Sequence, residues 1–198
     1  DIDLTYINQA KILHLSSFAD DRQFKVILEL IDKLGSAVKL SFAPGALYTV
    51  KGLKVLAPIL KRTYLLFLNQ SEIQQLTGED VIAGTESCMG QGCQIIAVTL
   101  GKGSRIKKAT AVGYIRDSKN EYVIKPRDIG AGMDTTGAGD AFAAGFLYGI
   151  IKGKSLEECG RLGNIVAQFC ITKIGAREGL PTLNELARHY QELYLQPL

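Results

Sequence analysis

Runs of apolar, β-branched residues alternate with amphipathic stretches through the first half of the chain. This alternation is typical of a parallel β-sheet whose strands are joined by crossover helices. The apolar runs, each of which we interpret as a strand, cover residues 12–18, 38–42, 64–68 and 94–100. The pattern predicts one helix between Asp20, its cap, and Gly35, and a second helix over residues 48–60. Two short helical pieces are expected between the third and fourth strands.

The second half of the chain has a different pattern. Residues 106–125 show short polar and apolar alternations with turn residues, which favours antiparallel hairpins at one sheet edge, and Gly101 and Gly103 are expected to end the strand before them. Three helices are predicted after the hairpins, over residues 137–152, 155–173 and 182–194. The chain is therefore expected to be an α/β protein with a mostly parallel sheet and an antiparallel edge.

Length and composition favour one globular domain over residues 1–198, because 46% of the 198 residues are hydrophobic. A net charge of +3 without a long Lys/Arg run gives no sign of nucleic-acid binding. No apolar run is long enough for a membrane span, so we expect a soluble, cytoplasmic protein with no membrane partner. The four cysteines lack CxxC spacing and are expected to be reduced thiols: Cys88, Cys93, Cys159 and Cys170.

The string Asp134–Phe142, with the sequence DTTGAGDAF, joins a turn of small residues directly to an apolar helix. Gly137, Ala138 and Gly139 let backbone N–H groups approach an anion, and the helix start adds free donors and the positive end of a dipole. Asp140 in the first turn is placed to accept a proton from an attacking hydroxyl. Gly-rich turns before helices are also common without this function, and an acid there can simply complement the dipole.

This string resembles the C-terminal signature of the ribokinase family, also called the PfkB family of carbohydrate kinases. The resemblance extends over essentially all of the chain and implies a three-layer α/β/α fold, with Asp140 as catalytic base and residues 137–139 as anion hole. Full-length members begin with a strand, a Gly-Gly motif and a small β lid, none of which is present here. We therefore expect the chain to be the C-terminal, catalytic, ATP-binding portion of a longer kinase.

Asn69 and Glu72 directly follow an apolar strand and resemble the family's NxxE motif, which helps to position Mg²⁺, mostly through water. Their spacing of three places both polar groups on one side of a helical turn, where they can meet one hydrated cation. An Asn cap followed by Glu at the third helical position is also an ordinary capping box.

Thr99 and Gly101 resemble the family's strand end that contacts ATP phosphates, and Gly103 departs from many relatives by one residue of spacing. A Gly turn that closes a buried strand is the structural alternative. Asn164 stands where the family lines its adenine pocket, although a partly exposed helical Asn is also common.

The segment Cys170–Arg177 resembles a loop that binds a monovalent cation together with the DTTGAGD string. The resemblance implicates the Asp134 carboxylate and, as a set, the backbone carbonyls of Thr136, Cys170, Lys173 and Gly175. Carbonyl cages suit K⁺. Gly179 departs from some potassium-using relatives, which have Ser there.

The resemblance implies phosphoryl transfer from ATP, with Mg²⁺, to a hydroxyl of a sugar or nucleoside, and it allows a homodimer in the full-length protein. Residues 41–45 differ from many sugar kinases, so the substrate is left open, as is activity of this portion alone. Pyrimidine-alcohol kinases usually have Cys where Asp140 stands. The alternative from another class is a non-catalytic nucleotide-binding or regulatory module of the same fold. A dinucleotide-dependent dehydrogenase fits poorly because no GxGxxG follows the early strands.

Overall fold

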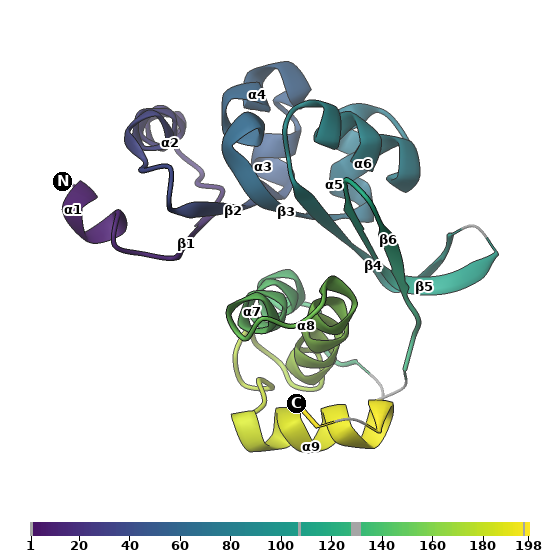
Figure 1. The fold of residues 1–198 in the computed structure, drawn as a ribbon. Coiled ribbons are helices and arrows are strands. Elements are labelled where there is room, and N and C mark those ends of the chain that lie inside the picture. The colour runs from purple at the N-terminus through teal and green to yellow at the C-terminus, as the bar shows by residue number, and fades with distance from the viewer. Residues whose placement is uncertain (1, 107, 128–131, 196) are drawn as a thin grey trace. The chain divides into compact units, whose positions relative to one another are not determined.

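The computed structural model describes residues 2–106, 108–127, 132–195 and 197–198 (Figure 1). Its strands are β1 (Ile12–Ser16), β2 (Lys39–Ala43), β3 (Thr63–Asn69), β4 (Ile95–Ile106), β5 (Ala109–Asp117) and β6 (Glu121–Ile124). Its helices are α1 (Leu4–Ile7), α2 (Asp21–Lys33), α3 (Gly45–Thr49), α4 (Gly52–Arg62), α5 (Gln70–Thr77), α6 (Val81–Gly90), α7 (Ala138–Ile151), α8 (Leu156–Cys170) and α9 (Leu183–Tyr194).

The chain divides into two compact units. Unit 1 comprises Asp1–Val98 and Arg116–Glu121, and unit 2 comprises Thr99–Ile115 and Tyr122–Leu198. The expected single domain over residues 1–198 stays a prediction.

The strands form one sheet in the order β1-β2-β3-β4-β5-β6. The β1–β2 and β2–β3 pairs are parallel, with His14 opposite Ser41 and Ser41 opposite Leu65. The edge of the sheet that contains the hairpin is antiparallel, which confirms the predicted sheet.

Unit 1 buries one face of helix α2 against its neighbours. Asp20 caps α2 by accepting a hydrogen bond from the Arg22 amide, as predicted. The ring of Phe24 packs edge-on against Tyr48 of α3, with ring centroids 5.0 Å apart, and Tyr48 also contacts Phe42 of β2. The apolar stripe of α2 thus becomes core because its spacing places these side chains on one face.

Two boundaries in the sequence prediction were wrong. The helix expected over residues 48–60 is two helices, α3 and α4, since Gly52 has a φ of 78° that a continuous helix does not allow. The fourth strand does not end at Gly101 or Gly103 but continues to Ile106 as part of β4. Both glycines have positive φ, 58° and 111°, and the strand continues because it enters the hairpin with β5.

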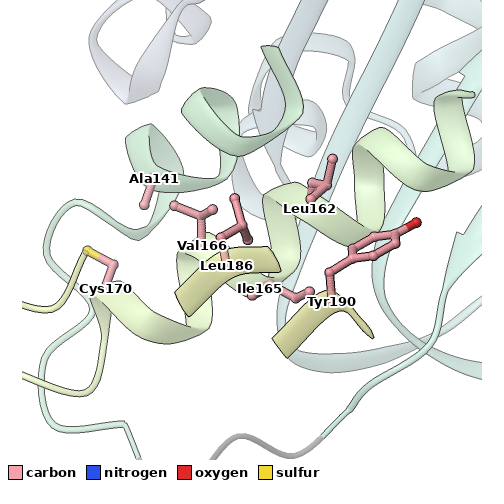
Figure 2. Close-up of a cluster of buried hydrophobic side chains, with 7 residues drawn as sticks. All are labelled: Ala141, Leu162, Ile165, Val166, Cys170, Leu186 and Tyr190. Atoms are coloured by element: carbon pink, nitrogen blue, oxygen red, sulfur yellow. The ribbon is translucent and has the colours of Figure 1, made fainter. Parts of the chain in front are cut away.

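Unit 2 is built on closely packed helices. A Cβ added at Gly145 of α7 would lie 2.8 Å from the carbonyl oxygen of Leu162, and one added at Gly163 of α8 would lie 2.7 Å from that of Phe142. Small residues therefore allow the backbones of α7 and α8 to approach. On another face of α8, Gly160 packs against Ile115 of β5 and against β6. Figure 2 shows the buried cluster that joins α7, α8 and α9: Ala141, Leu162, Ile165, Val166, Cys170, Leu186 and Tyr190.

The predicted caps of α8 and α9 are present as complete capping boxes, formed by Ser155 with Glu158 and by Thr182 with Glu185. All four cysteines are free and buried. Within the described ranges, no helix combines the length and the apolar character needed to cross a bilayer.

Candidate active site

Helix α7 begins at a glycine with a left-handed backbone. Gly137 is its N-cap, with a φ of 79°, and no side chain among the described residues caps the helix. A Cβ at Gly137 would lie 2.8 Å from the Ala176 carbonyl oxygen and 2.9 Å from its Cα. Backbone conformation and close packing therefore both require glycine at this position.

The first turn of α7 is open to solvent within unit 2. A Cβ added at Gly139 would meet nothing within 4 Å among the described residues, and Asp140 is exposed. The amides at the start of an α-helix lack intrahelical partners, and here no side-chain cap takes them. The Ala138 amide donates to the Thr135 carbonyl oxygen at 3.2 Å. The turn therefore offers a helix start without a side-chain cap, an exposed carboxylate and space beside Gly139.

Asp134 ties this turn to the segment that follows α8. One carboxylate oxygen accepts hydrogen bonds from the Thr136 amide at 2.9 Å and from its hydroxyl at 2.7 Å. The other oxygen accepts from the Gly175 amide at 2.9 Å. These bonds, first of all that from Gly175, hold the pKa of Asp134 below its ordinary value.

Backbone and thiol contacts strengthen the same junction. The carbonyl of Ile171 accepts hydrogen bonds from the Met133 amide at 2.7 Å and the Asp134 amide at 3.3 Å. The Cys170 thiol lies 3.5 Å from the Thr136 carbonyl oxygen and 3.4 Å from that of Ala176. Burial is the largest cause that raises the pKa of Cys170, so this thiol stays protonated and is a donor. Cys170 lies where α8 ends beside the start of α7 (Figure 2).

The residues suggested for a monovalent cation are partly brought together. Asp134, Thr136, Cys170 and Gly175 share the contacts above, and Lys173 lies in the same segment with an exposed side chain. A Cβ at Gly179 would overlap the Phe169 carbonyl oxygen and lie 2.7 Å from that of Cys170. The chain therefore approaches these carbonyls too closely for a serine at residue 179.

Asn69 and Glu72 form a complete capping box at the start of α5, in unit 1. The Asn69 side chain accepts from the Glu72 amide at 2.8 Å, and the Glu72 carboxylate accepts from the Asn69 amide at 2.9 Å. Burial raises the pKa of Glu72. Asn69 and Glu72 thus have the structural role of a helix cap. Only one of the two Glu72 carboxylate oxygens takes part in the capping box.

Thr99, Gly101 and Gly103 lie on β4, in unit 2. A Cβ at Gly101 would meet nothing within 4 Å among the described residues, whereas one at Gly103 would lie 3.1 Å from the Thr110 side chain of β5. Gly101 is therefore free to face a ligand, and Gly103 is explained by packing within the hairpin.

Asn164 is buried rather than partly exposed, with 7% of its surface accessible, and its Nδ2 has no hydrogen-bond partner in the described part of the chain. One turn further along α8, Gln168 has a buried Oε1 that also lacks a partner there. Sequence reasoning missed Gln168. Its spacing of four from Asn164, which places both amides on one helix face, was the available signal.

A mostly parallel α/β sheet and an open helix start in a Gly-rich turn are features that this chain shares with many α/β proteins that bind phosphate groups. The family model for "pfkB family carbohydrate kinase" matches residues 1–183, and the chain belongs to this family.

Curated relatives include an "Uncharacterized sugar kinase" of Archaeoglobus fulgidus, 42% identical, which covers 91% of this chain and is itself covered over 69% of its length. A "Cytidine kinase" of Thermococcus kodakarensis is 34% identical, with 84% of this chain and 57% of the relative covered.

Among solved structures, a ribokinase of Thermotoga maritima matches with a TM-score of 0.79 and 21% identity, over 96% of this chain and 60% of its own. At that identity the match concerns the fold, and it confirms the predicted ribokinase-like α/β class. The nucleoside kinase of Methanocaldococcus jannaschii matches with a TM-score of 0.73 and 26% identity, over 92% and 56% of the two chains.

Proposed function

We propose that the protein is an ATP-dependent phosphotransferase that phosphorylates an alcohol group of a sugar or nucleoside. The observation that carries the proposal is the open first turn of α7, which combines uncapped amides with the exposed carboxylate of Asp140. Names of the relatives, such as cytidine kinase and nucleoside kinase, support this substrate class.

In the proposed reaction the substrate hydroxyl oxygen attacks the γ-phosphorus of ATP while its proton passes to the Asp140 carboxylate. A new O–P bond forms, the bond to the β,γ-bridging oxygen breaks, and ADP leaves. The amides of residues 137–139, at the positive end of the α7 dipole, would stabilise the charge on the transferred phosphoryl oxygens. Asp140 is the one acid in the first turn of α7, and this position explains why base and anion hole would act together.

Asn69 and Glu72 would hold hydrated Mg²⁺, which neutralises phosphate charge when bound. The donor chemistry fits, because amide and carboxylate oxygens suit this ion and one Glu72 oxygen lies outside the capping box. Thr99, Gly101 and Gly103 would contact the phosphates, and Asn164 would contact the adenine.

A monovalent cation would be held by the Asp134 carboxylate and the carbonyls of Thr136, Cys170, Lys173 and Gly175. Asp134 accepts three hydrogen bonds, which leaves its carboxylate with spare acceptor capacity. The Asp134 carboxylate therefore suits a monovalent cation. Without a cation, Asp134 already joins the turn at the start of α7 to the segment after α8.

The test uses the intact protein. Isothermal titration with ATP and Mg²⁺ measures binding, and a coupled ADP-release assay on ribose, cytidine, adenosine and inosine measures turnover. We expect binding together with substrate-dependent ADP release. Binding without turnover on any alcohol would instead support the non-catalytic module, and failure to bind nucleotide would refute both functions.

A further inference from the structure

The hairpin formed by β4 and β5 carries positive charge that no acid within it balances. Residues 99–115 contain no Asp or Glu, and their cations are Lys102, Arg105, Lys107 and Lys108. Lys102, Arg105 and Lys108 belong to the described part of the chain, and all three are exposed. None of these three forms an ion pair with a carboxylate of the described residues. The hairpin is therefore a region of concentrated positive charge.

Other cations of unit 2 are partly neutralised by acids on the neighbouring helical turn. Three ion pairs join residues four apart in sequence: Lys154 with Glu158, Arg161 with Glu157, and Arg188 with Glu192. The field of such a pair falls off faster with distance than the field of a single charge, because the two opposite charges largely cancel. The hairpin cations have no such partner among the described residues, so their fields add outside the molecule.

This charge lies on the strand that carries a proposed phosphate contact. Gly101 of β4 is followed directly by Lys102, and a Cβ added at Gly101 would meet nothing within 4 Å among the described residues. A strand rises about 3.4 Å per residue, so Arg105 lies at most about 14 Å along β4 from Gly101. The field of a charge reaches about 10 Å at 0.1 M salt and about 30 Å at 0.01 M. The hairpin therefore acts on an anion that approaches Gly101 before any contact is made.

We propose that the β4–β5 hairpin attracts the polyphosphate chain of a nucleotide toward Gly101 by long-range electrostatics. Attraction of this kind raises the association rate constant and has little effect on the dissociation rate constant. ATP carries one more negative charge than ADP, so the hairpin favours the association of ATP. This inference rests on the proposed function, because it requires that unit 2 binds a nucleotide.

The experiment measures the association and dissociation rate constants of a fluorescent nucleotide, N-methylanthraniloyl ATP, with the intact protein by stopped flow. In the unmodified protein, the association rate constant should fall about tenfold between about 20 and 200 mM NaCl. The combined variant Lys102→Gln, Arg105→Gln and Lys108→Gln should lower this constant about tenfold at the lower salt concentration and flatten its salt dependence. Its dissociation rate constant should stay within about twofold of the unmodified value.

A matched control removes the same net charge from exposed positions of α2 and α4 in unit 1. It combines Lys25→Gln, Lys33→Gln and Lys54→Gln, and it should keep the association rate constant within about twofold. Equal losses in the two triple variants would show that the net charge of the protein matters and its place on the hairpin does not. That result would overturn the inference.

A charge-preserving variant separates long-range attraction from a specific contact. Lys102→Arg, Arg105→Lys and Lys108→Arg, combined, should keep the association rate constant, because attraction depends on charge and not on the shape of the side chain. The fluorescent ADP analogue should associate about two- to threefold more slowly than the ATP analogue in the unmodified protein, and at a similar rate in the glutamine variant. A faster dissociation with unchanged association in the glutamine variant would indicate contact with the bound nucleotide and would contradict the inference.

Failure of this inference is distinguishable from failure of the proposed function. If the unmodified protein binds the ATP analogue and the glutamine variant keeps the full association rate constant, only the role of the hairpin is wrong. If the unmodified protein binds neither analogue at any salt concentration, the proposed function itself is wrong.

Discussion

Helix α5 begins with a complete capping box, whereas α7 begins at Gly137 with no side-chain cap among the described residues. In α5 the Asn69 and Glu72 side chains satisfy backbone amides within four residues of sequence. In α7 no side chain of the described residues accepts from the corresponding amides, and the turn is held from outside by contacts with the segment after α8. A helix start that has no side-chain cap, yet is fixed in position, is suited to bind an anion.

The largest effect is expected from Asp140→Asn, which keeps the shape of the α7 start but removes the proposed base. Turnover in the ADP-release assay should fall by about 10³-fold, while the dissociation constant for ATP changes little. Asp32→Asn, at an exposed position of α2, is the control and should leave both quantities unchanged. Equal losses of turnover and ATP affinity would contradict the role of a base.

Gly137 and Gly139 separate the fixed part of the α7 start from its open part. Gly137→Ala should destabilise the protein by about 2–4 kcal/mol, because an L-residue is strained at a φ of 79° and its Cβ meets Ala176. Gly139→Ala has free space and should leave the melting temperature nearly unchanged while weakening ATP binding. Thermal melts and titrations measure both. A similar destabilisation by the two variants would show that the turn is packed on all sides.

Local signals in the sequence were enough to predict much of the fold. Capping at Asp20, Ser155 and Thr182 is determined within four residues, and the structure has each cap. The wrong boundaries involve glycines, Gly52 and Gly101, whose effect depends on the φ that the surrounding structure selects. Composition shows where a glycine is, but not whether the chain breaks there or continues.

In the candidate site too, features set by neighbouring residues could be predicted, and contacts between distant residues could not. The string 134–142 predicted the open turn because turn and helix start are adjacent in sequence. The thiol of Cys170 contacts the carbonyl of Thr136, from which it is 34 residues away in sequence, and no pattern of residue types specifies such a contact. Gln168 was missed for a related reason, since the burial of its Oε1, which has no hydrogen-bond partner among the described residues, exists only once the chain is folded.

The capping box of α5 has a matched counterpart in α8, which sharpens the comparison. Asn69→Ala and Ser155→Ala each remove a cap and should each destabilise the protein by about 1 kcal/mol. Only Asn69→Ala should also lower kcat/KM for ATP with Mg²⁺, by about tenfold, if Asn69 holds the hydrated ion. Identical kinetics for the two variants would reduce Asn69 to a cap.

The external support of the α7 turn can be tested with two buried thiols of α8. Cys170→Ala and Cys159→Ala each delete one buried sulfur, and each should cost about 1–2 kcal/mol of stability. The Cys159 thiol donates to the Lys154 carbonyl oxygen, which is not part of the turn at the start of α7. Only Cys170→Ala should lower kcat, by about fivefold, with partial rescue by Cys170→Ser. If both alanine variants keep the unmodified kcat, the thiol does not position the turn.

The smallest effect is a difference in how the two helix starts respond to acid. The pKa of Asp134 lies below its ordinary value of 3.8 because of hydrogen bonds, so its stabilising contribution is present above that value and is lost as the pH falls through the lowered pKa. The pKa of Glu72 lies above 4.5 because of burial, so its contribution is present below 4.5 and is lost as the pH rises through the raised pKa.

Melting temperatures between about pH 6 and pH 3 measure both responses. Asp134→Asn should make the loss of stability in acid shallower, and Glu72→Gln should make it steeper because it removes a compensating gain. Equal slopes in the two variants would mean that the hydrogen bonds to Asp134 do not hold the α7 turn. The turn would then depend on the Ile171 backbone and the Cys170 thiol, and the preorganisation proposed for its amides would have to come from those contacts alone.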